Sequence, residues 1–287
     1  MKRLSRAAIA ILVAAAGCSG GDGARRSEGE SVTIALDPAG AEGGPLPAVT
    51  PARGADPPLV VIDPGHGGRD PGAASPFGDA REKDITLALA RAMRDALARS
   101  GRVRVALTRD DDAYLALEQR YDVARRLGAD LFVSVHADAA PANDLARGAT
   151  IYTLSEVASD REAALLAARE NASGLIAGAR LSPDAQVNLI LIDLAQRESM
   201  DVSAEFARLL YREASPVFPF RPQWHRFAAF VVLKAPDIPS ILFESGYLTN
   251  ETDAAYIQSG AGRAQIAEGM RRAIEAHFAR RFLDRTS

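Results

Sequence analysis

Two of the four histidines in this 287-residue chain end the two runs that are most typical of buried β-strands. His66 follows the apolar residues 59–62 and an Asp-Pro-Gly turn, and His136 ends the run 131–136. Open α/β sheets bind ligands at the carboxyl ends of their strands, and neutral imidazole is the commonest metal ligand. The glycines around His66 let the backbone approach a ligand closely. We therefore expect a metal site built on both histidines, the alternative being two ordinary residues at a sheet end.

A catalytic zinc ion takes three protein ligands and keeps one position open, so a third ligand is needed. Glu82 is the best candidate, because it stands in the first turn of an expected helix whose N-terminus could point toward the His66 loop. A glutamate is also favoured in a first turn by the helix dipole alone. Position by itself leaves both interpretations open.

A general base is the next requirement, and Glu244 is the candidate. It interrupts the apolar run 241–243 just before Gly246. Burying a carboxylate there is costly unless it is paired or used. In apolar surroundings its pKa would rise, and it could take a proton from water and later donate it to a leaving amine. The alternative is a strand-end glutamate in a surface salt bridge.

The elements that must position these residues alternate between strands and helices. Strands are expected at 59–62, 103–109, 131–138, 148–154, 227–234 and 240–246, and helical patterns at 82–100, 115–127, 159–214 and 262–282. This alternation predicts an α/β fold, a single three-layer domain with a mostly parallel twisted sheet flanked by helices. The metal site would lie at the carboxyl ends of the strands, and the domain would occupy residues 59–284.

Composition excludes some functions. Hydrophobic residues make up 47% and charged residues 25% of the chain, which is ordinary for a globular protein. The net charge of −3 argues against a nucleic-acid partner. With 6% aromatic residues, the composition contains no evident platform for stacking bases or sugars.

The N-terminus is typical of an export signal. Residues 1–6 are basic, residues 7–16 form an apolar run too short to span a bilayer, and Cys18, the only cysteine, follows. The segment resembles a bacterial lipoprotein signal, with Ala15 in place of the usual leucine. We therefore expect residues 1–18 to be a lipoprotein-like signal peptide in which Cys18 becomes the lipidated N-terminus. An ordinary signal peptide with an incidental cysteine is the alternative. Residues 19–58, rich in Gly, Pro and charge, are expected to be a flexible linker.

Four motifs together resemble the zinc-dependent N-acetylmuramoyl-L-alanine amidases, the periplasmic enzymes of bacterial cell separation. They are residues 63–68 (DPGHGG), 81–84 (REKD), 134–139 (SVHADA) and 234–250 (KAPDIPSILFESGYLTN). The resemblance implies a peptidoglycan substrate and a Zn²⁺ cofactor with His66, Glu82 and His136 as ligands. It implies Glu244 as the catalytic residue. The family's Glu-Thr-Gly-Phe stretch is Glu-Ser-Gly-Tyr here, which keeps the acid.

The resemblance also implies regulation. Cell-separation members carry a helical insertion, here expected at residues 155–226, in which a helix covers the zinc until a protein activator displaces it. Glu170 is our candidate for the inhibitory contact, although a helix of Ala, Leu, Arg and Glu also fits ordinary packing. Because only the linker precedes Leu59, we expect no separate wall-targeting domain, and a lipid anchor at Cys18 would localise the protein in the periplasm.

Two other functions remain open from the sequence. A zinc peptidase that cuts within stem peptides would use the same metal chemistry. A wall-binding or regulatory domain with a relict site would need no chemistry at all, but a relict would be expected to have lost at least one of the four chemical residues.

Overall fold

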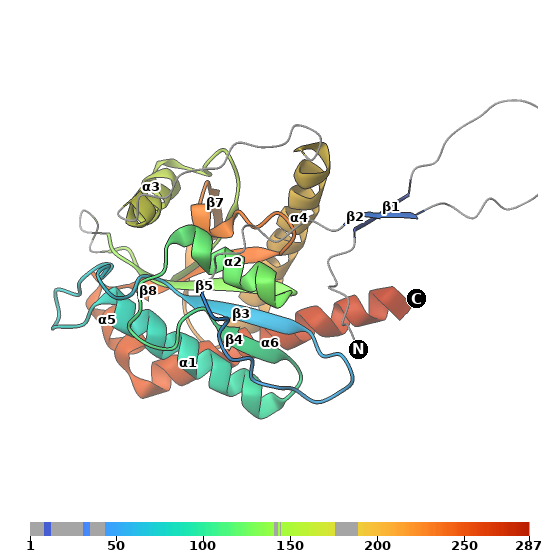
Figure 1. Ribbon diagram of the computed structural model, residues 1–287. Helices are drawn as coiled ribbons and strands as arrows, with labels where there is room; N and C mark the ends of the chain where they lie inside the picture. Colours follow the sequence, from blue (N-terminus) through green and yellow to red (C-terminus); the bar gives the residue numbers. More distant parts are fainter. Residues whose placement is uncertain are drawn as a thin grey trace, which may run out of the picture.

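A six-stranded sheet forms the centre of the protein (Figure 1). The computed structural model describes residues 9–12, 31–34, 44–140, 143, 145–175 and 189–286. The strands lie in the order β4-β3-β5-β8-β6-β7. Their bounds are β3 Leu59–Pro64, β4 Arg104–Leu107, β5 Leu131–Asp138, β6 Ala149–Leu154, β7 Phe220–Ala228 and β8 Ser240–Tyr247. Two short strands, β1 Ile9–Leu12 and β2 Ser31–Ile34, pair with each other in a separate sheet.

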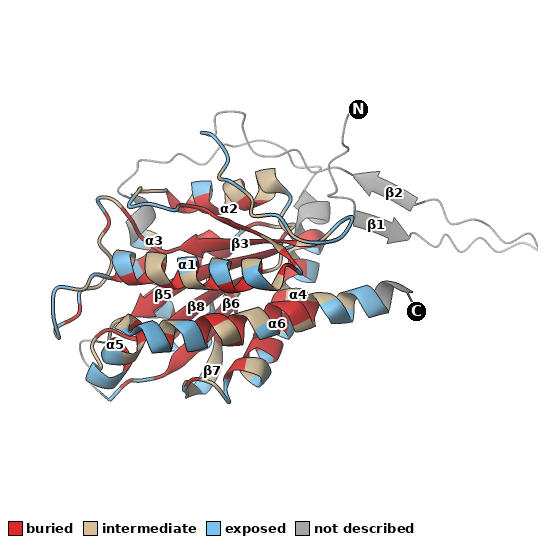
Figure 2. Cartoon of the chain, turned by 90° about the horizontal axis from the view of Figure 1, so that it is seen from below, coloured by how far each residue is buried: buried red, intermediate tan, exposed pale blue. Residues whose placement is uncertain are grey.

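The sheet is mostly parallel. Strands β4, β3, β5 and β8 run in one direction, while β6 pairs antiparallel with β8 and parallel with β7. The central strands β3, β5 and β8 are buried along their whole length (Figure 2), which explains why their sequences are nearly continuous apolar runs. The polar side chains that interrupt these runs therefore lie in the interior, at or near the carboxyl ends of the strands.

Helices cover both faces of the sheet and complete three layers. One face carries α1 Glu82–Ser100, α4 Leu189–Ala214, α5 Glu251–Gln258 and α6 Gly260–Thr286. The other face carries α2 Leu117–Leu127, α3 Arg161–Leu175 and the 3₁₀ turn η1 Val231–Leu233. The predicted fold class, a single α/β domain with a mostly parallel sheet between helices, is confirmed.

Helix α1 is held by a stripe of apolar side chains. Ile85, Leu89, Met93 and Leu97 follow the helical period and are buried against the sheet. Gly101 ends the helix in the left-handed conformation with φ of 64°, and its N–H donates to the carbonyl of Leu97. The first turn, which contains Glu82, is thereby fixed at the carboxyl end of β3.

One predicted strand is wrong. The apolar run 227–234 does not form a strand; β7 ends at Ala228, and the residues that follow turn into η1. Val232 and Leu233 pack into the core from that turn, which is why the run is apolar. The strand itself begins earlier, at Phe220, where Pro222 and charged residues obscure the pattern at the edge of the sheet.

Two predicted boundaries also shift. The expected linker 19–58 reaches onto the domain, because Thr50 pairs with Val105 of β4 through two backbone hydrogen bonds of 2.8 and 3.2 Å. A free sheet edge has unpaired backbone groups, and this segment pairs with those of Val105. The expected insertion 155–226 contains core structure: Phe206 and Leu210 of α4 are fully buried, and β7 belongs to the sheet. Of the insertion, α3 alone among the described helices lies over the predicted site.

No helix in the described ranges is long and apolar enough to cross a membrane. Cys18 lies outside the described residues.

Candidate metal centre

The loop after β3 brings the two predicted histidines together. The imidazole centroids of His66 and His136 lie 5.0 Å apart. His66 itself has a φ of 60°, a left-handed conformation that is unusual for a residue with a side chain. A Cβ atom on Gly65 would lie 2.4 Å from the His136 ring. Glycine is therefore required at this position for the two histidines to approach each other.

Glu82 completes a compact group of three ligand atoms. Its Oε1 lies 3.0 Å from His66 Nε2 and 3.1 Å from His136 Nδ1, and the three candidate ligand atoms lie within 4.8 Å of one another. All three side chains are buried. The carboxylate is oriented by two backbone N–H groups, since Ala137 donates to Oε1 at 3.1 Å and Ala73 to Oε2 at 2.8 Å. The helix dipole alone does not explain a glutamate that is held this way.

The electrostatics of the group fit a metal. Burial opposes ionisation of Glu82, but the two histidines hold its pKa well below the usual value. Burial also opposes protonation of His66, yet Glu82 and Asp70 raise its pKa well above the usual value. A cation is thus favoured at this position, and a bound metal would replace the proton.

His66 is oriented as a zinc ligand would be. Its Nδ1 lies 2.9 Å from Asp70 Oδ2, so the other ring nitrogen, Nε2, faces Glu82 and Glu170. A carboxylate behind the far ring nitrogen fixes the imidazole of most metal-binding histidines. Two imidazoles and one carboxylate form a donor set that suits Zn²⁺, and the residues present fit that ion.

Glu244 lies beside these three residues, and its carboxyl group is buried. It faces His136 across the β5–β8 pair and is 1% exposed. Neither of its carboxylate oxygens has a hydrogen-bond partner in the described part of the chain. Burial, and next the negative charges of Asp138 and Glu82, raise its pKa well above the usual value. The alternative of a surface salt bridge is wrong, and a buried, unpartnered carboxyl of raised pKa is a candidate acid–base group.

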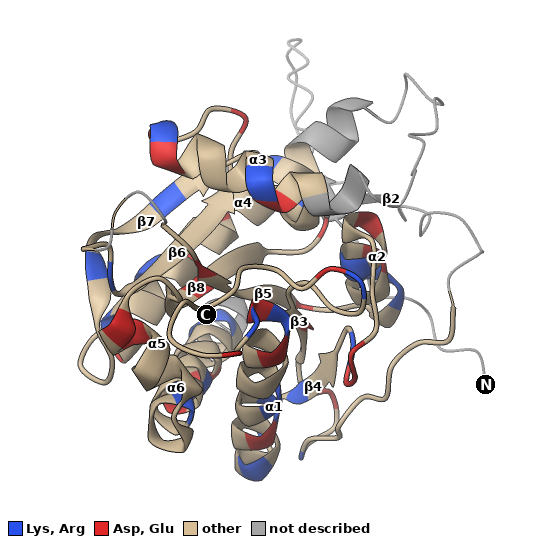
Figure 3. Cartoon of the chain, turned by 90° about the vertical axis from the view of Figure 1, so that its left-hand side faces the viewer, with Lys and Arg blue, Asp and Glu red and all other residues tan. Residues whose placement is uncertain are grey.

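Helix α3 lies on the side of the sheet that carries α2, opposite α1 and α6 (Figure 3), and its Glu170 reaches the two histidines. Its Glu170 is buried, with Oε2 3.4 Å from both His66 Nε2 and His136 Nδ1. The preceding residue, Arg169, donates to Asp138 Oδ1 at 2.9 Å. The structure therefore brings Glu170 to the same two histidines as Glu82.

Charged side chains anchor α3 at its N-terminal end. Arg226 of β7 pairs with Asp160 and Glu162, and Arg221 of β7 pairs with Glu162 at 2.6 Å. The carboxylates of Asp160 and Glu162 are 43% and 45% exposed, whereas the side chains of Arg226 and Arg221 are 4% and 13% exposed. Each pair therefore joins an exposed carboxylate to a largely buried arginine. Three small or medium apolar side chains pack the helix onto the domain: Ala163, Leu166 and Ala167.

Two buried arginines hold the His66 loop, and neither was predicted from the sequence. Arg120 donates to the carbonyls of Pro64 at 2.8 Å and His66 at 2.7 Å, and Arg109 donates to that of Gly65 at 2.8 Å. Asp63 neutralises part of this charge by pairing with Arg120 at 3.0 Å. An aspartate inside an apolar strand was the one available signal, but its partners are 45 to 71 residues away in the chain.

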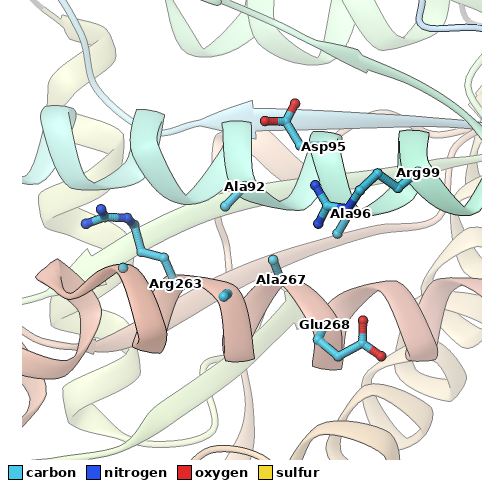
Figure 4. A pocket seen from close by; sticks show the side chains of 9 residues that line it. Ala92, Asp95, Ala96, Arg99, Arg263, Ala267 and Glu268 are labelled. Carbon is cyan, nitrogen blue, oxygen red and sulfur yellow. The ribbon is translucent and has the colours of Figure 1, made fainter.

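A groove between α1 and α6 has a volume of about 280 Å³ (Figure 4). Its lining alternates alanines with charged side chains and includes Ala92, Asp95, Arg99, Arg263 and Glu268. The α1 residues in it follow Glu82 by ten positions or more, about 15 Å along a helix. The groove is thus separate from the histidine cluster, and no histidine lines it.

Comparison with known proteins agrees with this geometry. A family model described as N-acetylmuramoyl-L-alanine amidase matches residues 60–276. The chain is 35% identical over 222 residues to the amidase AmiA of Escherichia coli K12, covering 77% of this chain and 76% of that protein. It is 35% identical over 241 residues to AmiC of Escherichia coli O6:H1, which covers 83% of this chain but 57% of that protein. The chain thus spans little more than half of that relative.

Solved structures show the same fold. The catalytic domain of CwlV, an amidase from Bacillus (Paenibacillus) polymyxa, is 25% identical with a TM-score of 0.58, covering 77% of this chain and 98% of that one. AmiC2 of Nostoc punctiforme is 26% identical with a TM-score of 0.56, covering 79% and 99%. The family match extends over well more than half of the sequence. The chain therefore belongs to the N-acetylmuramoyl-L-alanine amidase family.

Proposed function

We propose that the protein is a zinc-dependent amidase that hydrolyses the amide bond between N-acetylmuramic acid and the L-alanine of the peptidoglycan stem peptide. The observation that carries the proposal is the unpartnered carboxyl of Glu244 beside the buried group of His66, Glu82 and His136. Family membership supports this bond as the one cleaved.

The three ligand residues would hold the zinc ion. When bound, zinc polarises a carbonyl group and lowers the pKa of water, which is the chemistry that amide hydrolysis needs. The carboxylate of Glu244 takes a proton from the attacking water. As the bond between carbonyl carbon and nitrogen breaks, the same group gives that proton to the leaving amine. The apolar strand around Glu244 keeps its pKa high enough for both roles.

Digestion of purified peptidoglycan tests this reaction. We expect zinc-loaded protein with α3 released to liberate stem peptides that begin with intact L-alanine, identified by mass. The variant Glu244→Gln, which has the same shape but cannot take the proton, should bind zinc and release none. Fragments cut inside the stem peptide would indicate a zinc peptidase instead. No release from any folded, zinc-loaded form would favour a wall-binding module.

We also propose that α3 inhibits the enzyme and that a protein activator displaces it. Glu170 lies close enough to both histidines to serve as a fourth ligand, which closes the position that water and substrate need. Glu170→Ala should raise activity without activator by about tenfold or more, equivalent to ~1.4 kcal/mol. Glu156→Ala removes an exposed glutamate from the loop before α3 and should change nothing. Unchanged or lower activity of Glu170→Ala would refute the inhibition.

The location of the enzyme is part of the proposal. Residues 1–18 act as an export signal, Cys18 is lipidated, and the linker that follows holds the catalytic domain away from a membrane in the periplasm. There it would act in cell-wall remodelling and separation of daughter cells. Labelled palmitate should be incorporated by the full chain and not by Cys18→Ser, and equal labelling would refute the anchor.

A further inference from the structure

Helix α3 contributes two adjacent charged side chains to the site, and the proposed function uses one of them. Arg169, the other, is bound on both sides of its guanidinium. Nη2 donates to Asp138 Oδ1 at 2.9 Å, and Nη1 donates to the carbonyl of Ala139 at 3.0 Å. Its Nε donates to Glu170 Oε1 at 3.1 Å. Arg169 therefore fills a defined position next to the metal ligands.

The acceptors of that position belong to the rigid part of the fold. Asp138 is the last residue of β5, two residues after His136, and is 4% exposed. The N–H of Ala139 donates to the same Oδ1 at 2.6 Å and fixes the carboxylate. Arg169 is the one side chain that hydrogen-bonds to this carboxylate in the described part of the chain. When α3 leaves, the carboxylate loses that partner.

We propose that the Asp138 carboxylate and the Ala139 carbonyl form a subsite for an N–H donor of the substrate, which Arg169 occupies while α3 is closed. The proposal rests on the proposed function, because it requires α3 to leave. An amide substrate presents a carbonyl acceptor and, next to it, N–H donors. The closed helix presents the same order of groups, an acceptor carboxylate of Glu170 at the histidines and a donor guanidinium at Asp138.

Two parts of a stem peptide supply such a donor. One is a backbone amide N–H near the scissile bond, and the other is the side-chain ammonium of a diamino acid further along the peptide. Either would form a charge-assisted hydrogen bond with Asp138. The alternative is that Asp138 has a purely structural role. It would then only hold α3 in place and would not affect substrate binding or turnover once the side chains of α3 are removed from the site. The effect of Asp138 in a released enzyme separates these roles.

The experiment therefore uses the double variant Arg169→Ala, Glu170→Ala as its background, in which α3 keeps neither of its two charged side chains in the site. Asp138→Asn removes the charge and keeps the shape, and Asp95→Asn makes the same change on the exposed far part of α1 as a control. Two substrates are compared: N-acetylmuramoyl-L-alanyl-D-isoglutamine, which has no ammonium group, and the corresponding tripeptide ending in a diamino acid. Zinc content and the melting temperature confirm that each variant is folded and loaded.

We expect Asp138→Asn to lower kcat/KM by about 10- to 100-fold, the range for a lost charged hydrogen bond. Loss with both substrates assigns the donor to a backbone amide, and loss with the tripeptide alone assigns it to the ammonium. Equal values for Asp138→Asn and its background with both substrates would overturn the subsite.

Binding provides an independent measurement. In the inert triple variant Arg169→Ala, Glu170→Ala, Glu244→Gln, calorimetry gives the Kd of each intact substrate. Asp138→Asn should weaken binding of at least one substrate about tenfold or more, and no change would overturn the subsite. If the background protein cleaves neither substrate while Asp138 still determines binding, the result supports the subsite and refutes the proposed reaction.

Discussion

Helices α1 and α3 bring a glutamate to the same two histidines but are held by different forces. Glu82 arrives on α1, whose apolar stripe is buried in the main core and whose carboxylate is oriented by two backbone N–H groups. Glu170 arrives on α3, which has three small or medium buried apolar side chains and is otherwise anchored by ion pairs with exposed members. The two carboxylates are equally buried, at 1% and 4% exposure.

The difference distinguishes a carboxylate that the core holds in place from one that, under the proposed inhibition, is withdrawn with its helix. Burial of an apolar side chain stabilises by about 1.5 to 3 kcal/mol and is insensitive to moderate salt. An exposed ion pair contributes about 0 to 1 kcal/mol and is screened by salt. Under the proposed inhibition, withdrawal of α3 would therefore break few core contacts and leave the domain folded. Withdrawal of α1 would expose the main core.

The largest expected effect is on zinc affinity, which should depend on Glu82 but not on Glu170. Glu82→Ala should lower zinc affinity by more than the ~10- to 100-fold that follows loss of an outer hydrogen bond, and abolish amidase activity. Glu170→Ala should keep its zinc, because three ligands remain. Metal analysis after dialysis measures both. Equal zinc loss from the two variants would show that α3 is a permanent part of the site.

The next largest effect is on the free energy of unfolding, which should fall more when a leucine is truncated on α1 than on α3. Leu89 of α1 is fully buried, so Leu89→Ala should cost about 2 to 5 kcal/mol of unfolding free energy. Leu166→Ala on α3 should cost less, because the cavity opens beneath a helix that can move away, and should raise activity without activator. Denaturant unfolding and peptidoglycan digestion of both variants provide the data. An equal stability loss with no gain in activity for Leu166→Ala would contradict the comparison.

Acid should weaken the layer that contains α1. Burial, followed by the charges of Arg281 and Arg280, lowers the pKa of His277 to about 4. The unfolded chain binds this proton already near pH 6.5, so stability present above that pH is lost as the pH falls toward 4, by up to about 3 kcal/mol. His277→Leu should flatten the dependence of unfolding free energy on pH in this window. A slope equal to that of the unmodified protein would refute the assignment.

Salt should give the smallest effect, an increase in basal activity that acts through α3. At about 1 M KCl the Debye length is roughly 3 Å, which screens the pairs of Arg221 and Arg226. Basal activity should rise about two- to threefold, the equivalent of ~0.5 kcal/mol, with no change in melting temperature. Glu162→Gln should raise activity at low salt and reduce the response. A salt-independent activity in both proteins would show that the ion pairs do not hold the helix.

The sequence predicted the layered fold and placed both histidines at strand ends, because long apolar runs and their terminal turns are local signals. The position of β7 was mistaken, since edge strands carry weak patterns and the apolar run after Ala228 packs from a turn. The clamp of Arg109 and Arg120 on the His66 loop was not foreseen, because it depends on contacts between distant segments. The zinc-ligand and catalytic roles remain predictions that the geometry supports.

The backbone pairing of Thr50 with β4 has a practical consequence for solubility. A chain trimmed to begin at Leu59 would retain the sheet and all candidate metal and catalytic residues, yet leave the backbone of Val105 on the outer edge of β4 unpaired. Bare edges recruit other strands and initiate aggregation. The opposite edge, β7, carries Pro222 and two arginines, features that discourage such pairing. Because Thr50 covers part of this edge, we expect the domain to be more soluble when the residues just before the sheet are kept.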